Sequence, residues 1–149
     1  MSFTTSVGTR GGRVPRGPVM QLVNKAVTPI IRRRGRLGGQ HALILHTIGA
    51  KSGKERVVPV DWFPGPGGTW LIVASANGAA HNPAWFHNIK AHPDRVWIEV
   101  DGETVDVRAE QLLGDERAEA WKQIGAIPQF DAYQQKTDRE IPIIRLTRR

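Results

Sequence analysis

The hydrophobic pattern near the start of the chain predicts one helix. After Pro18, apolar residues recur at three- and four-residue intervals and a basic cluster follows them. This spacing predicts an amphipathic helix within residues 18–40, kinked near Pro29. Cations at its end suit the helix macrodipole, and cations beside an apolar stripe also suit an anionic membrane surface. The apolar positions are Val19, Met20, Leu22, Val23, Ala26, Val27, Ile30 and Ile31, and the basic ones are Arg32, Arg33, Arg34 and Arg36.

From residue 41 onward, short apolar runs of β type replace the helical spacing. Asp101-Gly102 is the clearest hairpin turn, and Asn82 is expected to be the N-cap of a helix with Pro83 in its first turn. Strands joined mostly by hairpins predict an α+β fold, an antiparallel barrel or half-barrel. The expected strands are residues 42–48, 57–63, 70–75, 95–100, 103–107 and 141–146, and the expected helices are residues 82–91, 114–124 and 130–135.

Length and composition predict a single domain whose redox chemistry, if any, depends on a bound cofactor. A chain of 149 residues builds one core, at residues 41–149, while residues 1–17 are rich in Gly, Ser, Thr and Arg and are expected to form a mobile basic tail. Cysteine is absent, which excludes disulfides, cysteine-ligated metals and thiol catalysis. Redox chemistry would therefore need a bound cofactor. No apolar run approaches the ~20 residues of a membrane span, so we expect a cytoplasmic protein, in peripheral contact with the membrane if the helix binds lipid.

The positive charge of the chain is concentrated in its first third. The formal net charge is +7, and all 14 acidic residues lie after residue 54. This asymmetry predicts an anionic partner, which is nucleic acid, membrane phosphate or a polyanionic small molecule, unless the basic face is merely solvated. Nucleic acid is disfavoured because Phe3 is the only aromatic residue before Trp62.

Two segments are candidates for ligand binding. In residues 49–56 the glycines turn the chain, and Lys51, Ser52 and Arg56 offer charge and hydrogen bonds to a phosphate or carboxylate, although such hairpins are often only solvated turns. In residues 74–85 small residues permit a flat ligand to approach the backbone. Trp85 and its neighbour Phe86 either wall that pocket or anchor the helix to the core. The five histidines match no metal-ligand spacing, so no metal site is predicted.

Several separated motifs, in the same order, resemble the deazaflavin (coenzyme F420)-dependent nitroreductase and quinone reductase family. They are His46-Thr-Ile-Gly-Ala-Lys-Ser-Gly-Lys-Glu-Arg56, Val73-Ala-Ser75, Asn82-Pro-Ala-Trp-Phe-His-Asn88, Ala91-His-Pro93 and Thr137-Asp-Arg-Glu-Ile-Pro142. The resemblance implies a split β-barrel with inserted helices that holds F420 in a groove, as a monomer or weak dimer. By position, it implies these cofactor-binding residues: Lys51, Ser52 and Arg56 for the acidic tail, Pro59 and Val60 beside the ring, Ala74, Ser75, Ala76 and Asn77 as a backbone cradle, and Trp85 and Asn88 on the closing helix.

The implied activity is transfer of hydride from the reduced deazaflavin to a quinone, nitro compound or other activated acceptor. The resemblance makes Ser75 and Tyr133 the candidate catalytic hydroxyls. The acceptor would meet Asp61, Ile127, Phe130 and Tyr133, where characterised relatives are rich in tyrosine, and Ala76 replaces a frequent lysine. Two alternatives stay open: a split-barrel protein that binds FMN or haem, and a non-catalytic anion-binding or membrane-surface module.

Overall fold

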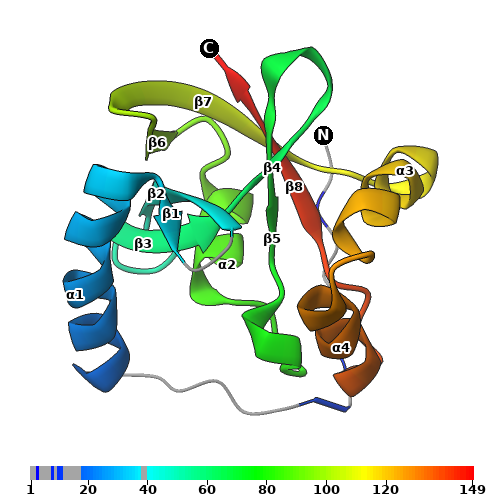
Figure 1. The fold of residues 1–149 in the computed structure, drawn as a ribbon. Helices are drawn as coiled ribbons and strands as arrows, with labels where there is room; N and C mark the ends of the chain where they lie inside the picture. Colours follow the sequence, from blue (N-terminus) through cyan, green and yellow to red (C-terminus); the bar gives the residue numbers. More distant parts are fainter. Residues whose placement is uncertain (1–2, 4–7, 9, 12–17, 38–39) are drawn as a thin grey trace.

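The computed structural model describes residues 3, 8, 10–11, 18–37 and 40–149. Most of the expected 1–17 tail, and residues 38–39, lie outside the described residues. Figure 1 shows a curled sheet with helix α1 on one side and helices α3 and α4 on the other. The strands are β1 (Arg36–Leu37), β2 (Gln40–Ile48), β3 (Glu55–Asp61), β4 (Phe63–Pro64), β5 (Trp70–Val73), β6 (Val96–Val100), β7 (Glu103–Gln111) and β8 (Ile143–Arg148). The α-helices are α1 (Pro18–Arg34), α2 (Ala84–Ala91), α3 (Gly114–Ile124) and α4 (Pro128–Lys136), with 3-10 turns η1 (Pro66–Gly68) and η2 (Ala76–Gly78).

The described strands form one antiparallel sheet in the order β1-β2-β6-β7-β8-β5-β4, and β3 pairs with β2. The Asp101-Gly102 hairpin is confirmed, because β6 and β7 pair around it and both residues have the positive φ of a tight turn, 50° and 77°. Strand β7 continues to Gln111 because β8 pairs with its second half. The expected α+β antiparallel architecture is therefore confirmed.

The sheet buries apolar side chains on both faces. Its inner face packs against α2 through residues such as Leu43, Ile72 and Phe86. A second cluster lies between β5, β8 and the helices α3 and α4. Helix α1 covers part of the outer face, where Ile31 packs against Ala42. The helices therefore flank the sheet on both sides. The candidate site is built from the loops that follow β2 and β5.

The predicted N-cap of α2 is wrong. Pro83 occupies the N-cap position, with no side-chain capping bond. Asn82 is buried, and its Oδ1 accepts a hydrogen bond from Nη1 of Arg139 at 2.6 Å. A buried guanidinium, which carries a charge, is a stronger partner than the backbone N–H groups of the helix start. Asn82 thus belongs to the loop before the helix.

Helix α1 starts at the predicted residue, Pro18, and carries Pro29 inside it, but it ends at Arg34 and not at residue 40. The predicted end is wrong because Gly35 has a positive φ of 68° and Arg36–Leu37 pair with β2 as strand β1. Only part of its apolar stripe packs on the sheet, because Leu22, Val23 and Ile30 are 66%, 46% and 44% exposed. In the part of the chain that the structure describes, no helix combines the length and apolarity needed to cross a membrane.

Candidate functional site

The turn between β2 and β3, residues 49–54, is closed by its own backbone. Gly49 donates its N–H to the carbonyl of Lys54 at 2.8 Å, and Gly53, with φ of +68°, donates to the carbonyl of Gly49 at 3.0 Å. Ser52 Oγ accepts the Lys54 N–H at 3.2 Å, so this hydroxyl supports the turn. We call residues 49–54 the 49–54 hairpin.

Three cations of this region are free to meet an anion. Lys51 and Lys54 on the 49–54 hairpin, and Arg56 on β3, are all exposed. Among the described residues, none of the three is held in an ion pair, whereas Arg32, Arg145 and Arg148 are. Neighbouring cations without partners repel one another, so a multiply charged anion is the ligand that such a set favours.

Asn88, on α2, fixes the base of the hairpin. Its Oδ1 accepts the N–H of Ala50 at 2.9 Å, and its Nδ2 donates to Oγ1 of Thr47 at 3.1 Å. Thr47 is fully buried and lies opposite Arg56 in the β2–β3 register, which places Arg56 on the face of the sheet where α2 packs. The amide predicted to bind a ligand therefore has internal partners on both its atoms.

The segment between β5 and α2, which we call the 74–82 loop, is organised by one buried cation. Arg139 is 2% exposed, and its guanidinium donates to the carbonyls of Ala74 (3.0 Å), Ser75 (2.9 Å) and Ala79 (3.1 Å). Burial lowers the pKa of Arg139 to about 10. It stays charged at neutral pH, so the loop is built around a positive charge.

At the start of this loop the backbone makes a concave donor site. Ser75 has right-handed helical angles (φ −72°, ψ −37°), and Ala76 follows with a positive φ of 46°. A right-handed residue followed by a left-handed one turns successive N–H groups to one side, an arrangement called a nest that binds anionic or electron-rich atoms. Among described residues, no acceptor pairs with the N–H of Ser75 or Ala76. The side chain of Asn77, in η2, lies outside the described part.

Helix α4 packs against the same loop. A Cβ on Gly78 would lie 2.7 Å from the carbonyl oxygen of Tyr133, so η2 and α4 are in close contact. The Tyr133 hydroxyl is 2.6 Å from Nε2 of Gln129, which donates to it, and the ring meets Phe130 edge-on. Phe130 is buried in the second core cluster, with Ile127 packed against it. Of the predicted acceptor residues on α4 and its N-cap, Tyr133 alone combines partial exposure with a polar side chain, and its backbone carbonyl is the group that contacts the 74–82 loop.

The predicted residues of β3 divide between two faces of the sheet. Val60 lies opposite Leu43 and packs on the main core, whereas Pro59 and Asp61 lie opposite Ile44 and Ala42, on the face that α1 covers. Burial raises the pKa of Asp61. Trp85, on α2, is 8% exposed and belongs to the main core, so its packing role is evident.

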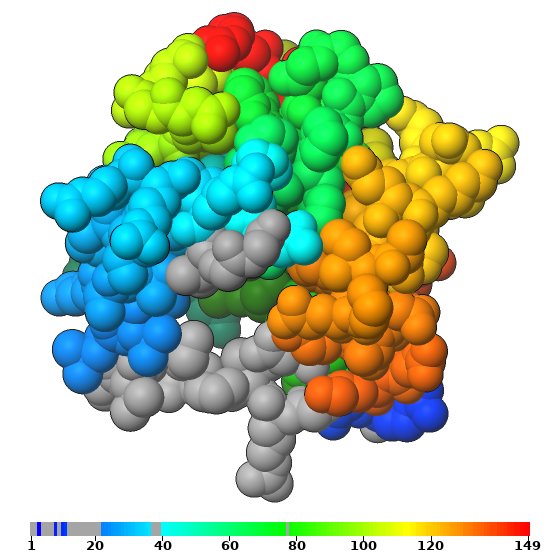
Figure 2. All heavy atoms as spheres, viewed as in Figure 1, coloured from blue at the N-terminus to red at the C-terminus, as the bar shows by residue number. Residues whose placement is uncertain are grey.

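The structure thus packs α4 against the 74–82 loop and links that loop to the 49–54 hairpin through α2. Helix α2 starts where the loop ends and reaches the hairpin through Asn88. Figure 2 shows the surface hollowed between the blue and cyan residues of α1 and its neighbouring strands and the orange residues of α4, with green residues deeper in the hollow.

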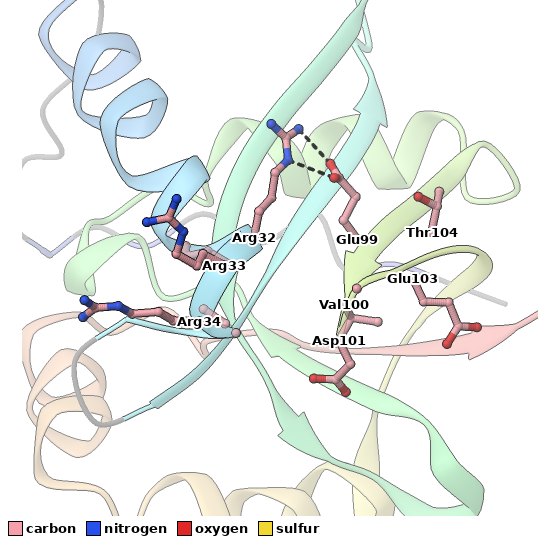
Figure 3. A pocket seen from close by; sticks show the side chains of 12 residues that line it. Arg32, Arg33, Arg34, Glu99, Val100, Asp101, Glu103 and Thr104 are labelled. Atoms are coloured by element: carbon pink, nitrogen blue, oxygen red, sulfur yellow. Dashed lines mark hydrogen bonds and ion pairs between the residues drawn. The ribbon is translucent and has the colours of Figure 1, made fainter.

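A different cavity, of about 430 Å³, lies between the end of α1 and the β6–β7 hairpin. None of the predicted site residues lines it. Figure 3 shows Arg32 paired with Glu99 at its edge, while Arg33 and Arg34 extend away from the acidic side chains of the hairpin. Arg32, together with His46, lowers the pKa of Glu99. This cavity lies where α1 packs on the sheet, and we do not assign it to the candidate site.

Comparison with known proteins identifies the family of the chain. A profile of the F420H(2)-dependent quinone reductase family matches residues 19–148. The chain belongs to this family. An F420H(2)-dependent quinone reductase of Mycobacterium tuberculosis (strain H37Rv) is 36% identical over 116 residues, which cover 75% of this chain and 76% of the relative.

Solved structures show the same fold. A structure described as an F420-H2 dependent reductase (FDR-A) is 37% identical, with a TM-score of 0.62 over 71% of this chain and 93% of the other. A second structure, described as a domain-swapped dimer, is 33% identical, with a TM-score of 0.63 over 87% of this chain and all of the other. The fold is a split β-barrel, as the resemblance implied.

The sequence analysis did not predict a role for Arg139, which organises the 74–82 loop of this F420H(2)-dependent quinone reductase family member. It stands inside the motif Thr137-Asp-Arg-Glu-Ile-Pro142, yet the sequence offers no sign that its partners lie 57 to 65 positions earlier. One sequence feature could have indicated its position. Arg139 lies two residues before the short apolar run Ile141 to Leu146, and a strand there would bring the arginine close to the sheet.

Proposed function

We propose that this protein binds reduced coenzyme F420 and uses it to reduce a quinone. As a member of the F420H(2)-dependent quinone reductase family, it is an F420-dependent reductase. The observation that carries the proposal is the family match over residues 19–148, which includes both the 49–54 hairpin and the 74–82 loop. The bound deazaflavin supplies the hydride.

The residues present fit this cofactor at both ends. The acidic tail of F420 suits the hairpin, where Lys51, Lys54 and Arg56 have no carboxylate partner in the described part of the chain. The polar edge of a ring suits the nest at Ser75 and Ala76, whose two N–H groups have no acceptor among described residues. Helix α2 begins where the 74–82 loop ends and contacts the hairpin through Asn88, four residues along, so about 6 Å of helix rise links the two ends.

The remaining predicted residues would shape the groove. Strand β3 would lie beside the ring, with Val60 on its core face and Pro59 on the face that α1 covers. Ala74 and Asn77 would complete the backbone cradle, and Ser52 holds the hairpin in shape. Trp85 and Asn88 act through packing and anchoring. Positioning of two bound reactants supplies a large part of the rate in such a transfer.

On the acceptor side, the hydroxyls of Ser75 and Tyr133 would hold or deliver a proton to the reduced oxygen. The Tyr133 hydroxyl already accepts a hydrogen bond from Gln129, which leaves its own proton available for donation. Ile127 and Phe130 support Tyr133 from the second core cluster. Asp61, on the α1 side of β3, would meet an acceptor that enters beneath that helix. Nitro compounds and other activated acceptors are further candidates.

The test is a binding titration followed by turnover. Purified protein is titrated with F420 and with the tail-less deazaflavin riboside, and oxidation of reduced F420 is then followed after addition of menadione or a nitro compound. We expect saturable binding that weakens when the tail is removed, and oxidation that depends on the quinone. Absence of saturable F420 binding would refute the proposal, and visible absorption from co-purified FMN or haem would favour the alternative cofactors.

We also propose that α1 docks peripherally on an anionic membrane, where lipid-soluble quinones reside. Leu22, Val23 and Ile30 are exposed, and Arg33 and Arg34 extend from the end of the helix into solvent. An apolar face flanked by cations inserts into an anionic lipid surface more favourably than into a neutral one. Such binding would place the protein at the inner face of the cell membrane. We expect it to be a monomer or weak dimer there.

A further inference from the structure

Arg139 is a buried cation without an acidic partner. Its guanidinium is bonded to three backbone carbonyls and to the side-chain oxygen of Asn82, all of them neutral groups. No carboxylate lies within ion-pair distance of it among the described residues. A charge that remains uncompensated in a buried place is costly, because desolvation opposes it. Such a charge is expected where a ligand supplies the compensation.

The guanidinium also sets the direction of two peptide groups. Nη1 binds the carbonyl of Ala74, and Nη2 binds the carbonyl of Ser75. The peptide bond is planar and trans, so the N–H of the next residue points away from the carbonyl. With both carbonyls turned inward to Arg139, the N–H groups of Ser75 and Ala76 are turned outward. Both residues are partly exposed, so this side of the loop is open to a ligand.

The same contacts strengthen these two donors. A cation at the carbonyl oxygen polarises the peptide group, and hydrogen bonds in series reinforce one another. The nest at Ser75 and Ala76 therefore carries the partial charges of its N–H groups together with the field of a full positive charge behind them. Its preferred partner is an oxygen or nitrogen atom that carries negative charge.

We infer that Arg139 is the positioning residue of the ring site: it turns the Ser75 and Ala76 N–H groups outward and makes the nest selective for the electron-rich edge of a planar heterocycle. This inference rests on the proposed function, because it takes the deazaflavin ring as the occupant. Arg139 itself does not touch the ligand. It acts through the peptide groups of Ala74 and Ser75.

A purely structural role for Arg139 makes a different prediction. In that case the guanidinium only holds the C-terminal segment to the 74–82 loop, and its charge has no effect on the ligand. The substitution Asn82→Asp separates the two roles. Its Oδ1 still accepts from Nη1 of Arg139, but the new carboxylate neutralises the cation where it lies.

The experiment measures the affinity of wild type, N82D, R139K and R139M for F420 and for the tail-less riboside, whose ionisable groups all lie on the ring, over a range of pH. We expect N82D to keep or gain stability against urea and to bind the riboside at least about tenfold more weakly. Its affinity should also rise less with pH than that of the wild type, since the neutralised nest no longer favours the ionised ring. R139K should fall between wild type and R139M.

The control is Lys122→Gln, which makes the same change in net charge on the exposed face of α3 and should leave binding unchanged. If N82D folds and binds the riboside with wild-type affinity and pH profile, the inference is overturned, whatever R139M does. If R139M does not fold, N82D still decides. If the wild type itself fails to bind F420, it is the proposed function that fails.

Discussion

The side-chain oxygen of Asn88 accepts a hydrogen bond from the backbone N–H of Ala50 at 2.9 Å. Through this bond α2 holds the 49–54 hairpin, although 38 positions separate the two residues in the sequence. The second bond of the same amide, to Thr47, is buried. The hairpin is thus positioned by a helix whose other end begins at the 74–82 loop.

Replacing Asn88 by alanine should lower the free energy of unfolding by about 1 to 3 kcal/mol, because two hydrogen bonds are lost and the buried hydroxyl of Thr47 loses its donor. Urea denaturation measures the change. Thr47→Val removes only the second bond and should cost less. An unfolding midpoint equal to that of the wild type would show that Asn88 does not anchor the hairpin.

Removing a cation from the hairpin region should weaken binding of the F420 tail and leave binding of the deazaflavin ring unchanged. Lys51→Ala or Arg56→Ala is expected to reduce affinity for F420 by roughly ten- to a hundredfold, from the loss of one charge-assisted contact. Affinity for the tail-less riboside should stay the same. The effect should shrink at high salt. Equal losses for the two ligands would place the hairpin beside the ring instead of the tail.

The positive φ of Ala76, 46°, predicts that glycine is better tolerated there. Alanine in this conformation carries a steric cost that glycine does not, so Ala76→Gly should raise the free energy of unfolding by about 0.5–1 kcal/mol, net of the greater freedom of glycine in the unfolded chain. Asp101 has a similar φ of 50°, but aspartate tolerates it better, so Asp101→Gly should gain less. Destabilisation by A76G would contradict this account.

The interaction between Arg32 and Glu99 should appear as loss of stability in acid. Arg32 first, and His46 as well, lower the pKa of Glu99 below its ordinary 4.5. A lowered pKa stabilises the folded state above the unfolded pKa, and this contribution is lost as the pH falls through the folded pKa. Glu99→Gln should therefore be less stable than wild type at neutral pH, with the difference closing in acid. A difference that is independent of pH would contradict the prediction.

The pH dependence of stability that Asp61 contributes has the opposite sign to that of Glu99. Burial raises its pKa above 3.8, so its contribution is most favourable below the unfolded pKa and is lost as the pH rises through the folded one. Asp61→Asn should therefore gain stability at neutral pH and none in strong acid. Urea denaturation of both variants across the same pH range compares the two signs directly.

Docking of α1 on a membrane should depend on its exposed apolar residues. Replacing Leu22, Val23 and Ile30 by serine should reduce cosedimentation with vesicles that contain anionic lipid, because the apolar area inserted into the interface is lost. F420 binding in solution should not change. Vesicles of neutral lipid serve as the control. Cosedimentation of the triple variant at the wild-type level would exclude this face of the helix.

Local signals account for the parts of the fold that the sequence predicted. Asp101 and Gly102 form a turn through their own backbone preferences, and helix α3 begins and ends at the predicted residues, Gly114 and Ile124. Such features depend on neighbours in the sequence. The prediction for Asn82 was wrong because its partner, Arg139, lies 57 positions later, and no local rule ranks that contact against a helix cap.

The candidate site shows the same division. The exposed cations and the small residues of the 74–82 loop were visible in the sequence, and the family motifs gave their order. The internal use of Asn88 and the burial of Phe130 were not, because each depends on which face of a helix meets the sheet. Conservation within a motif does not distinguish a residue that touches a ligand from one that holds another residue in place.

The contacts of Arg139 also bear on the order in which the protein is made. The loop that it shapes is synthesised nearly complete some sixty residues before the arginine leaves the ribosome, and strand β5 meanwhile waits for β8. A nascent or truncated chain that stops short of this residue has every amino acid of the nest but not its shape. If the nest holds the ring as proposed, competence to bind it arrives only with the last part of the polypeptide.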